Sequence, residues 1–203
     1  MSDSKKFRDW DDRYADSDYL FGTAPNDFLK SVADRLAPNS RILCLADGEG
    51  RNGVYLATLG HKVTAVDQSR VGLEKAKKLA EQKQVSIETI KADLAEYDLG
   101  VESLDCIVSI FFHIPSAVRA HIYPRIITAL KPGGILILES YTPEQLNHGT
   151  GGPPISDLML TKDELAQYFS EMNLEHLQEL ERKVIEGTGH TGLASVVQLL
   201  ALR

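Results

Sequence analysis

The sequence predicts an α/β protein built on a doubly wound, mostly parallel sheet. Two observations support this: short apolar runs alternate with helical segments from residue 41 onwards, and those runs are apolar almost throughout. Strands covered by helices on both faces show such continuous apolar character, and their alternation with helices is typical of parallel sheets. A chain of 203 residues can bury one full core, so we expect residues 1–203 to form a single domain.

The strands expected from the apolar runs come in two groups. The parallel strands are expected at residues 41–46, 62–67, 85–93, 104–112 and 133–141. Residues 174–184 and 192–203 are expected to form a final pair of strands, although the first of these stretches could also be helical.

The helices expected between these strands follow from apolar side chains at helical spacing. Residues 69–82 show this pattern, with Ser69 as a plausible N-cap and lysines such as Lys75 on a solvated face. Residues 116–130 repeat Val and Ile at four-residue steps, and Pro124 predicts a kink or a late start.

Two segments lie outside the alternation. Residues 1–36 precede the first strand, and residues 142–161 are rich in Gly and Pro. Thr161 and Glu164 then have the spacing of a capping box that begins another helix. Because ligands bind at the carboxyl ends of the strands in such sheets, we expect both segments to act as lids there.

Composition narrows the classes of function. The net charge of −7 disfavours a protein whose main partner is a nucleic-acid backbone. The two cysteines, Cys44 and Cys106, lie in apolar runs and are expected as buried thiols. The histidines are scattered, so no metal site is expected.

The ends and apolar runs of the chain predict its location. The N-terminus is charged from the start and lacks the apolar stretch of a signal peptide. The longest apolar runs fall short of the roughly 20 residues that a membrane helix needs. We therefore expect a cytoplasmic protein that does not associate with membranes.

A glycine loop follows the first expected strand and opens a helix. Gly48, Gly50 and Gly53 have the spacing of a dinucleotide fingerprint, in which backbone N–H groups at the helix start receive a ligand. Asp67 ends the second expected strand about 20 residues later, where a carboxylate can accept both hydroxyls of a ribose. Asp67 could instead cap the next helix.

A second acidic residue follows the third expected strand. Asp93 could accept the amino group of an adenine, while the backbone beside it at Ala92 and Leu94 frames the ring. Together with the glycine loop and Asp67, this position suggests a cofactor that contains adenosine.

At this point the sequence resembles the class I S-adenosylmethionine-dependent methyltransferases, and most closely the small bacterial tellurite-resistance and thiopurine methyltransferase-like group. The resemblance rests on WDDRYADSDYLFGTAPNDFL, GEGRNGVYLATLGHKVTAVDQS and ALKPGGILILESY. It implies a Rossmann-like, seven-stranded sheet with the last strand antiparallel. It also implies S-adenosyl-L-methionine as cofactor, a small-molecule acceptor such as a thiol or a metalloid oxyanion, and a monomer or homodimer.

The resemblance also implies roles for particular residues toward the cofactor. The residues implied to bind it are Trp10, Arg13, Tyr14, Ala46, Asp47, Gly48, Gly50, Asn52, Asp67, Gln68, Asp93, Leu94, Ser109, Ile110 and Phe111. The loop from Ala46 to Gly50 would line the methionine part, Asp67 and Gln68 the ribose, and Asp93 with Leu94 the adenine. Residues 109–111 would flank the sulfonium. Arg13 would reach the cofactor carboxylate beneath Trp10 and Tyr14.

The loop departs from the family pattern at its start. The acid that usually precedes the loop is Cys44, and the first loop glycine is Ala46. Cys44 cannot make the usual contact to the cofactor amino group, so Asp47 or Glu49 is a candidate substitute. We expect Ala46 to preserve the turn only with a negative φ.

Candidates for the chemistry lie near the same edge of the sheet. His113 follows the fourth expected strand and Tyr141 ends the fifth, so both are catalytic candidates, although each could be purely structural. His148 and His190 lie on glycine-rich turns and are candidates for mobile lid residues that contact the substrate. A base is required only if the acceptor must lose a proton, so a thiolate or a metalloid anion would need none.

Two other functions stay open at this level. The glycine spacing also fits a nicotinamide-dependent oxidoreductase, although no second nucleotide-binding half follows. The altered loop also fits a binding module that holds an adenosyl cofactor without turnover.

Overall fold

Seven strands form one sheet in the order β3-β2-β1-β4-β5-β7-β6. The computed structural model describes residues 9–203. The strands are β1 (Arg41–Leu45), β2 (Lys62–Asp67), β3 (Glu88–Lys91), β4 (Leu104–Ile110), β5 (Leu130–Tyr141), β6 (Asn173–Glu186) and β7 (His190–Leu202). Strands β1 to β5 pair in parallel, whereas β7 is antiparallel to both β5 and β6. The predicted doubly wound sheet with an antiparallel last strand is therefore confirmed.

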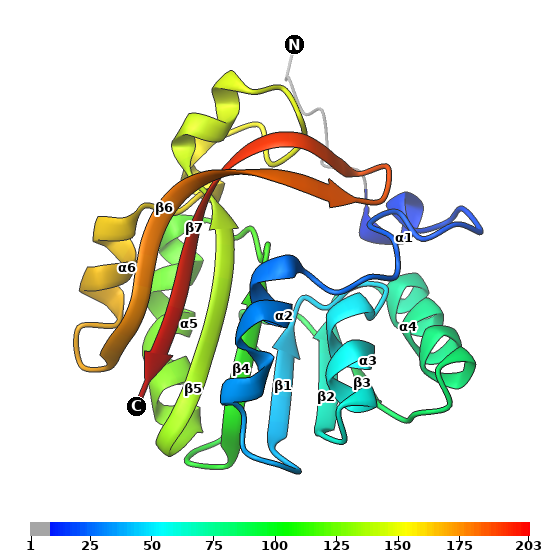
Figure 1. Ribbon diagram of the computed structural model, residues 1–203, viewed down its shortest axis with the longest axis horizontal. Coiled ribbons are helices and arrows are strands. Elements are labelled where there is room, and N and C mark those ends of the chain that lie inside the picture. Colours follow the sequence, from blue (N-terminus) through cyan, green and yellow to red (C-terminus); the bar gives the residue numbers. More distant parts are fainter. Residues whose placement is uncertain (1–8) are drawn as a thin grey trace.

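Helices cover both faces of the sheet (Figure 1). They are α1 (Trp10–Arg13), α2 (Asp27–Val32), α3 (Arg51–Thr58), α4 (Arg70–Gln82), α5 (Ser116–Ala129) and α6 (Lys162–Tyr168). Short 3-10 turns occupy η1 (Ala33–Arg35), η2 (Pro143–Asn147) and η3 (Ser156–Leu158). Among the described residues, no helix is both long and apolar enough to cross a membrane.

The strands alternate their side chains between two cores, as the period of a β-strand requires. On β1, Leu43 and Leu45 pack with α5 and α6, whereas Ile42 and Cys44 pack with α2 and α3. Both cysteines are buried, as expected. This double burial explains why the strands are almost continuously apolar.

Two helix starts agree with the sequence analysis. The Ser69 hydroxyl accepts the N–H of Gly72 and caps α4. Thr161 and Glu164 form the predicted capping box of α6. Pro124 lies inside α5, so the helix begins at Ser116 rather than late.

Some predicted bounds were wrong. β3 is limited to Glu88–Lys91 because it lies at the edge of the sheet, and the residues before it pack against α4. β4 ends at Ile110 because Phe111 adopts a φ of +53°, which a strand does not accommodate. The final pair β6 and β7 is a long hairpin that arches across the top of the sheet towards α1 (Figure 1).

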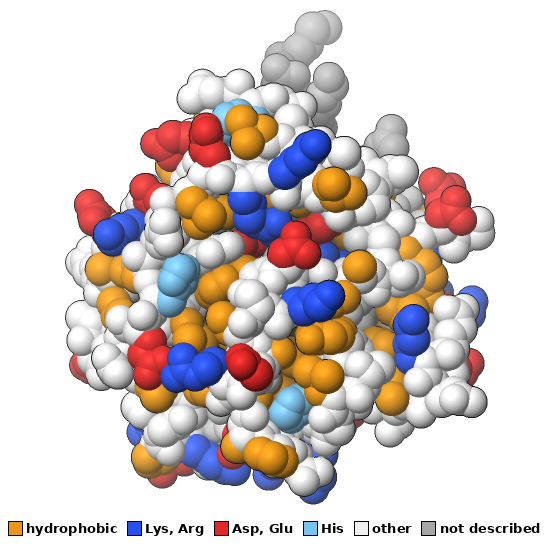
Figure 2. Space-filling view, in the orientation of Figure 1, with side chains coloured by type: hydrophobic (Ala, Val, Ile, Leu, Met, Phe, Trp, Pro, Cys, Tyr) orange, Lys and Arg blue, Asp and Glu red, His pale blue; other side chains and the backbone are white. Residues whose placement is uncertain are grey.

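Acidic and basic side chains are interspersed on the face shown in Figure 2.

Candidate functional site

A cavity of about 630 Å³ lies at the carboxyl ends of the parallel strands. The residues after β1, β2, β3 and β4 line its base, and α1, residues 151–154 and the tip of the β6–β7 hairpin line its other sides. A doubly wound sheet places its ligand site at this edge because the loops after the strands converge there. The cavity is large enough for a small organic molecule or cofactor.

The glycine loop folds tightly beneath the N-terminal segment. A Cβ on Gly48 would lie 2.6 Å from the Tyr14 hydroxyl oxygen, and one on Gly50 would lie 2.5 Å from the Ala76 side chain. Only glycine allows such approaches. The expectation of a negative φ at Ala46 was wrong, because Ala46 has a φ of +51° and keeps the left-handed turn of a glycine.

Asp67 is buried at the end of β2 and faces the cavity. Its carboxylate accepts the N–H groups of Gly48, at 2.8 Å, and Ser69, at 2.7 Å. Burial raises the pKa of Asp67, while these backbone hydrogen bonds oppose the rise. Ser69 is the N-cap of α4, so Asp67 does not have that role.

Asp47 is the second buried carboxylate at the loop. It accepts the N–H of Gly53 at 3.2 Å, which holds the start of α3 against the loop. Burial raises the pKa of Asp47 to about 7, and the nearby Asp67 contributes to the rise. The candidate substitute Glu49 instead forms an ion pair with Lys75.

Lys75 fastens the N-terminal segment over the loop. It is buried rather than solvated, which corrects the expectation for this helix face. Its Nζ donates to the carbonyl oxygens of Asp16, at 2.9 Å, and Asp18, at 2.6 Å. A lysine that saturates its donors in this way gains enough hydrogen bonds to lie inside the protein.

An aromatic cluster from the N-terminal segment forms part of the roof. The Arg13 guanidinium lies 4.1 Å from the ring centre of Trp10, and Trp10 packs on Tyr14 with 5.3 Å between ring centres. Phe21 joins this cluster and packs against His190, with 4.5 Å between the ring centres. The N-terminal segment and the hairpin tip therefore meet above the cavity.

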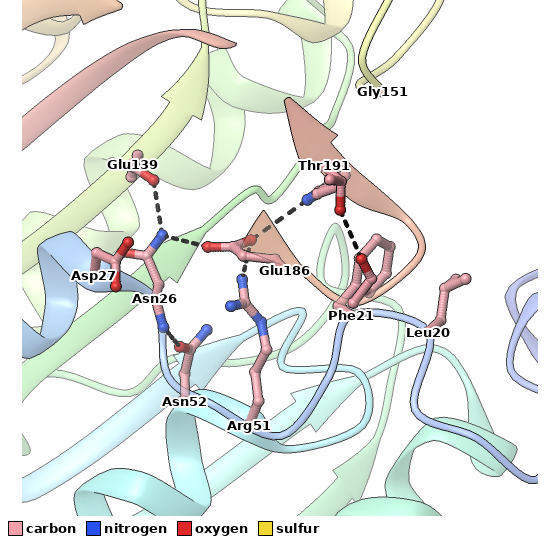
Figure 3. Close-up of polar contacts among 12 residues, drawn as sticks. Leu20, Phe21, Asn26, Asp27, Arg51, Asn52, Glu139, Gly151, Glu186 and Thr191 are labelled. Atoms are coloured by element: carbon pink, nitrogen blue, oxygen red, sulfur yellow. Dashed lines mark hydrogen bonds and ion pairs between the residues drawn. The ribbon is translucent and has the colours of Figure 1, made fainter. Parts of the chain in front are cut away.

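A buried polar network fixes that meeting point (Figure 3). Glu186, at the end of β6, accepts from Arg51 at 2.7 Å and from the Asn26 side chain at 3.1 Å. Asn26 also donates to Glu139, and its backbone N–H donates to the Asn52 side chain. These contacts join the glycine-loop helix, the N-terminal segment and the hairpin into one rigid corner.

Comparisons with known proteins show what the chain is similar to. Residues 42–134, a little under half of the chain, match the family described as a methyltransferase domain. The uncharacterized methyltransferase YodH of Bacillus subtilis (strain 168) is 33% identical over 136 residues, which cover 62% of this chain and 56% of YodH. The putative methyltransferase GWCH70_2453 of Geobacillus sp. (strain WCH70) is 29% identical over 64% of this chain and 57% of its own. The chain thus spans little more than half the length of these relatives.

Solved structures share the fold of the methyltransferase domain. TehB from Haemophilus influenzae superposes with a TM-score of 0.74 at 21% identity, over 89% of this chain and 63% of TehB. A SAM-dependent methyltransferase from Aquifex aeolicus superposes with a TM-score of 0.64 at 17% identity, over 90% of each chain. The predicted class I methyltransferase fold is therefore confirmed.

Most of the predicted site residues come together at the cavity. Those that line the cavity are Trp10, Arg13, Tyr14, Ala46, Asp47, Asn52, Asp67, Gln68, Asp93, Leu94, Ile110, Phe111, His113 and His190. His190 does not lie on a turn, because it begins β7 and is buried.

The other predicted residues lie behind or beside the lining. Gly48 and Gly50 form the buried backbone of the loop, and Ser109 is buried within β4. Tyr141 is fully buried behind Phe111, with 4.6 Å between ring centres. His148 is half-buried and pairs with Glu181 instead of lining the cavity.

The sequence analysis missed several lining residues. Phe21, Arg51 and Gly189 line the cavity, as do Leu158 and residues 151–154. Arg51 lies inside the predicted glycine loop, and Phe21 and residues 151–154 lie inside the predicted lids, but no motif singles out these side chains. Gly189 reaches the cavity only through the folding of the β6–β7 hairpin. Among residues 9–203, no group of three or more His, Cys, Asp or Glu side chains is arranged to hold a metal.

Proposed function

We propose that this protein is an S-adenosylmethionine-dependent methyltransferase that acts on a small molecule. The observation that carries the proposal is a methyltransferase domain whose cavity opens onto a buried carboxylate, Asp67, at the end of β2. A carboxylate at that position is suited to accept the hydroxyls of a ribose. When bound, the cofactor would supply the methyl group and the leaving group.

The lining residues fit such a cofactor. Ala46 and Asp47 would lie along its methionine part, and Asp93 with Leu94 would hold the adenine at the end of β3. Arg13 is the cation of the N-terminal segment that faces the cavity, and it would meet the cofactor carboxylate. Isolation of the reacting groups from water strengthens these charged contacts.

The segments around the cavity would serve as lids. Residues 9–36 are those of the proposed N-terminal lid that the structure describes, and residues 1–8 lie outside the described residues. The loop of residues 142–161 contributes Gly151, Gly152, Pro153 and Pro154 to the cavity lining. We propose that both segments close over bound ligands and exclude solvent, within a single domain.

A transfer assay tests the proposed activity. Purified protein is incubated with S-adenosylmethionine labelled in its methyl group and a panel of thiols, phenols and metalloid oxyanions. We expect labelled product with at least one acceptor and its loss in Asp67→Ala. Cofactor binding without transfer to any acceptor would indicate a binding module, and displacement of bound ligand by NADH would favour the oxidoreductase.

A further inference from the structure

One wall of the cavity carries no ionic side chain. The lining residues that follow β4, together with residues 151–154, Leu158 and the hairpin tip, include no Asp, Glu, Lys or Arg. In contrast, the rest of the lining contains ionic side chains of both signs, namely Arg13, Asp47, Glu49, Arg51, Asp67 and Asp93. The cavity therefore has an ionic half and an uncharged half.

Two histidines stand in the uncharged wall, and both are anchored through the same ring nitrogen. His190 Nδ1 lies 3.5 Å from a Glu186 carboxylate oxygen. His113 Nδ1 lies 3.3 Å from the Leu158 carbonyl oxygen. A carboxylate and a carbonyl can only accept, so Nδ1 carries the proton in each ring. Each Nε2 is thereby left with a lone pair, and His113 Nε2 has no hydrogen-bond partner among the described residues.

The two rings differ in their ability to accept a proton. Burial lowers the pKa of His113 to about 3, and only a carbonyl supports that ring. Burial also lowers the pKa of His190, but Glu186 opposes the fall. The other charged groups that act on His190 are the guanidinium groups of Arg51 and Arg13, which lower its pKa.

Glu186 is equipped to support a proton on His190. Its own pKa is lowered to about 2, with the hydrogen bond from His190 and the charge of Arg51 outweighing the effect of burial. An ionised carboxylate on Nδ1 stabilises the imidazolium that forms when Nε2 takes up a proton. The aromatic rings of Phe21, Phe111 and Tyr141 surround His190 and add no charge.

We propose that the uncharged wall receives a neutral acceptor with one O–H or S–H group and that His190 Nε2 removes its proton. This inference rests on the methyl transfer proposed above. The acceptor's O–H or S–H bond breaks, and the proton passes to Nε2 while Glu186 holds the ring. The freed electron pair forms the bond to the methyl carbon, whose bond to the sulfonium sulfur breaks. The proton then leaves His190 for solvent, and Glu186 acts as a positioning residue.

The same wall disfavours anionic acceptors. His190 Nε2 presents a lone pair that can accept a hydrogen bond from a hydroxyl or thiol, whereas it repels the oxygens of an oxyanion; His113 Nε2 is buried. The two cations of the cavity, Arg13 and Arg51, lie outside this wall, and Arg51 is already paired with Glu186. The expected acceptor is therefore a neutral hydroxyl or thiol compound rather than a metalloid oxyanion.

A spectroscopic experiment tests the arrangement without any acceptor. Protein with ¹⁵N-labelled histidine is saturated with S-adenosylhomocysteine at pH 7.5, and long-range ¹H–¹⁵N spectra are assigned with His113→Gln and His190→Gln. We expect both rings to be neutral with the proton on Nδ1, and the His190 Nδ1–H signal to move upfield in Glu186→Gln. A proton on Nε2 of His190 would overturn the proposal.

A kinetic experiment tests the role of His190. Transfer to substituted phenols and aliphatic thiols is compared with transfer to tellurite and iodide, in wild type and in His190→Gln. General base catalysis contributes about 100-fold or more, so we expect a loss of that size with phenols, alongside an unchanged affinity for S-adenosylhomocysteine. His121→Gln is the matched control because His121 is exposed on α5 and lies outside the cavity lining, and it should retain full activity.

The outcomes separate the two levels of the proposal. Three results would overturn the role of His190. They are a preference for tellurite or iodide, an equal rate in His190→Gln, and binding of S-adenosylhomocysteine without transfer to any neutral acceptor. Failure of the wild-type protein to bind S-adenosylhomocysteine would instead contradict the proposed function itself.

Discussion

Ala46 shows how one residue stores strain at the glycine loop. Its φ of +51° lies in the left-handed region, which costs an L-residue roughly 1–2 kcal/mol, whereas glycine adopts it freely. Ala46→Gly should therefore raise the free energy of unfolding by about 0.5–1 kcal/mol after the greater freedom of the unfolded chain is subtracted. Urea denaturation measures this change.

Ala76→Gly is the matched control for that prediction. Ala76 lies inside α4, where glycine is destabilising by roughly 1 kcal/mol, so the two substitutions should have opposite signs. Destabilisation by Ala46→Gly would show that the left-handed turn carries no strain.

Asp47 makes stability depend on pH. Its pKa is about 7 in the folded protein, against an ordinary value of 3.8 for an aspartate in the unfolded chain. The native state therefore binds more protons between these values, and the free energy of unfolding falls as pH rises from about 4 to 7. Asp47→Asn should flatten this fall by about 2 kcal/mol between pH 5 and 8, as measured by urea denaturation.

Asp105→Asn controls for the loss of a negative charge in general. The backbone N–H of Arg41 and the Lys131 side chain outweigh the effect of burial and lower the pKa of Asp105, so its titration does not contribute between pH 5 and 8. The pH dependence of this variant between pH 5 and 8 should match that of the wild type. An unchanged slope in Asp47→Asn would contradict the raised pKa.

At the scale of elements, Lys75 links α4 to the N-terminal segment. Lys75→Met removes the donors to Asp16 and Asp18 and leaves Glu49 buried without its partner. Breaking a buried pair in this way is expected to destabilise by roughly 3–5 kcal/mol. The double variant Lys75→Met/Glu49→Gln should recover much of that loss because no uncompensated charge remains.

Hydrogen exchange distinguishes the two effects of Lys75. In the double variant, the amides of residues 10–22 should exchange faster than in wild type, while those of β1 and β4 stay protected. Equal protection of residues 10–22 in both proteins would show that Lys75 does not hold the segment.

The elements themselves were largely predictable from the sequence. Strands β1 and β4 are buried on both faces, so their sequences are apolar almost throughout. Ser69 and Thr161 mark the starts of helices because their side chains cap the helix N-termini. The edge strand β3 was predicted too long because an edge strand buries little and leaves a weak pattern. Local patterns therefore sufficed wherever the element is fixed by its own residues.

The candidate site was predictable only in part, for a physical reason. The loop after β1 and Asp67 carry local signals, and the structure places them on one cavity. Lys75 was predicted on the solvated face, and Arg51 was missed, because their partners Glu49 and Glu186 reach them only through tertiary contacts. His190 was predicted on a turn, but it begins β7 because it pairs with Glu186 across the hairpin.

At the scale of the whole molecule, segments distant in sequence enclose one cavity. The Gly189 N–H donates to the Leu20 carbonyl oxygen at 2.9 Å, so the C-terminal hairpin closes against the N-terminal segment. A ligand held between them stabilises both. S-adenosylhomocysteine should therefore slow hydrogen exchange at residues 10–22 and 187–190 more than it slows exchange near Asn173, at the start of β6. Equal slowing at all of these residues would show that the ligand binds elsewhere.

The central claim is that this cavity binds the sulfonium cofactor through Asp67, and calorimetric titration with S-adenosylhomocysteine tests it most directly. We predict one site with a micromolar dissociation constant. In Asp67→Ala the binding free energy should weaken by about 1–3 kcal/mol because the ribose hydroxyls lose their partner. In Asp105→Asn the affinity should be unchanged. No heat and no thermal shift in the wild-type protein would contradict the claim.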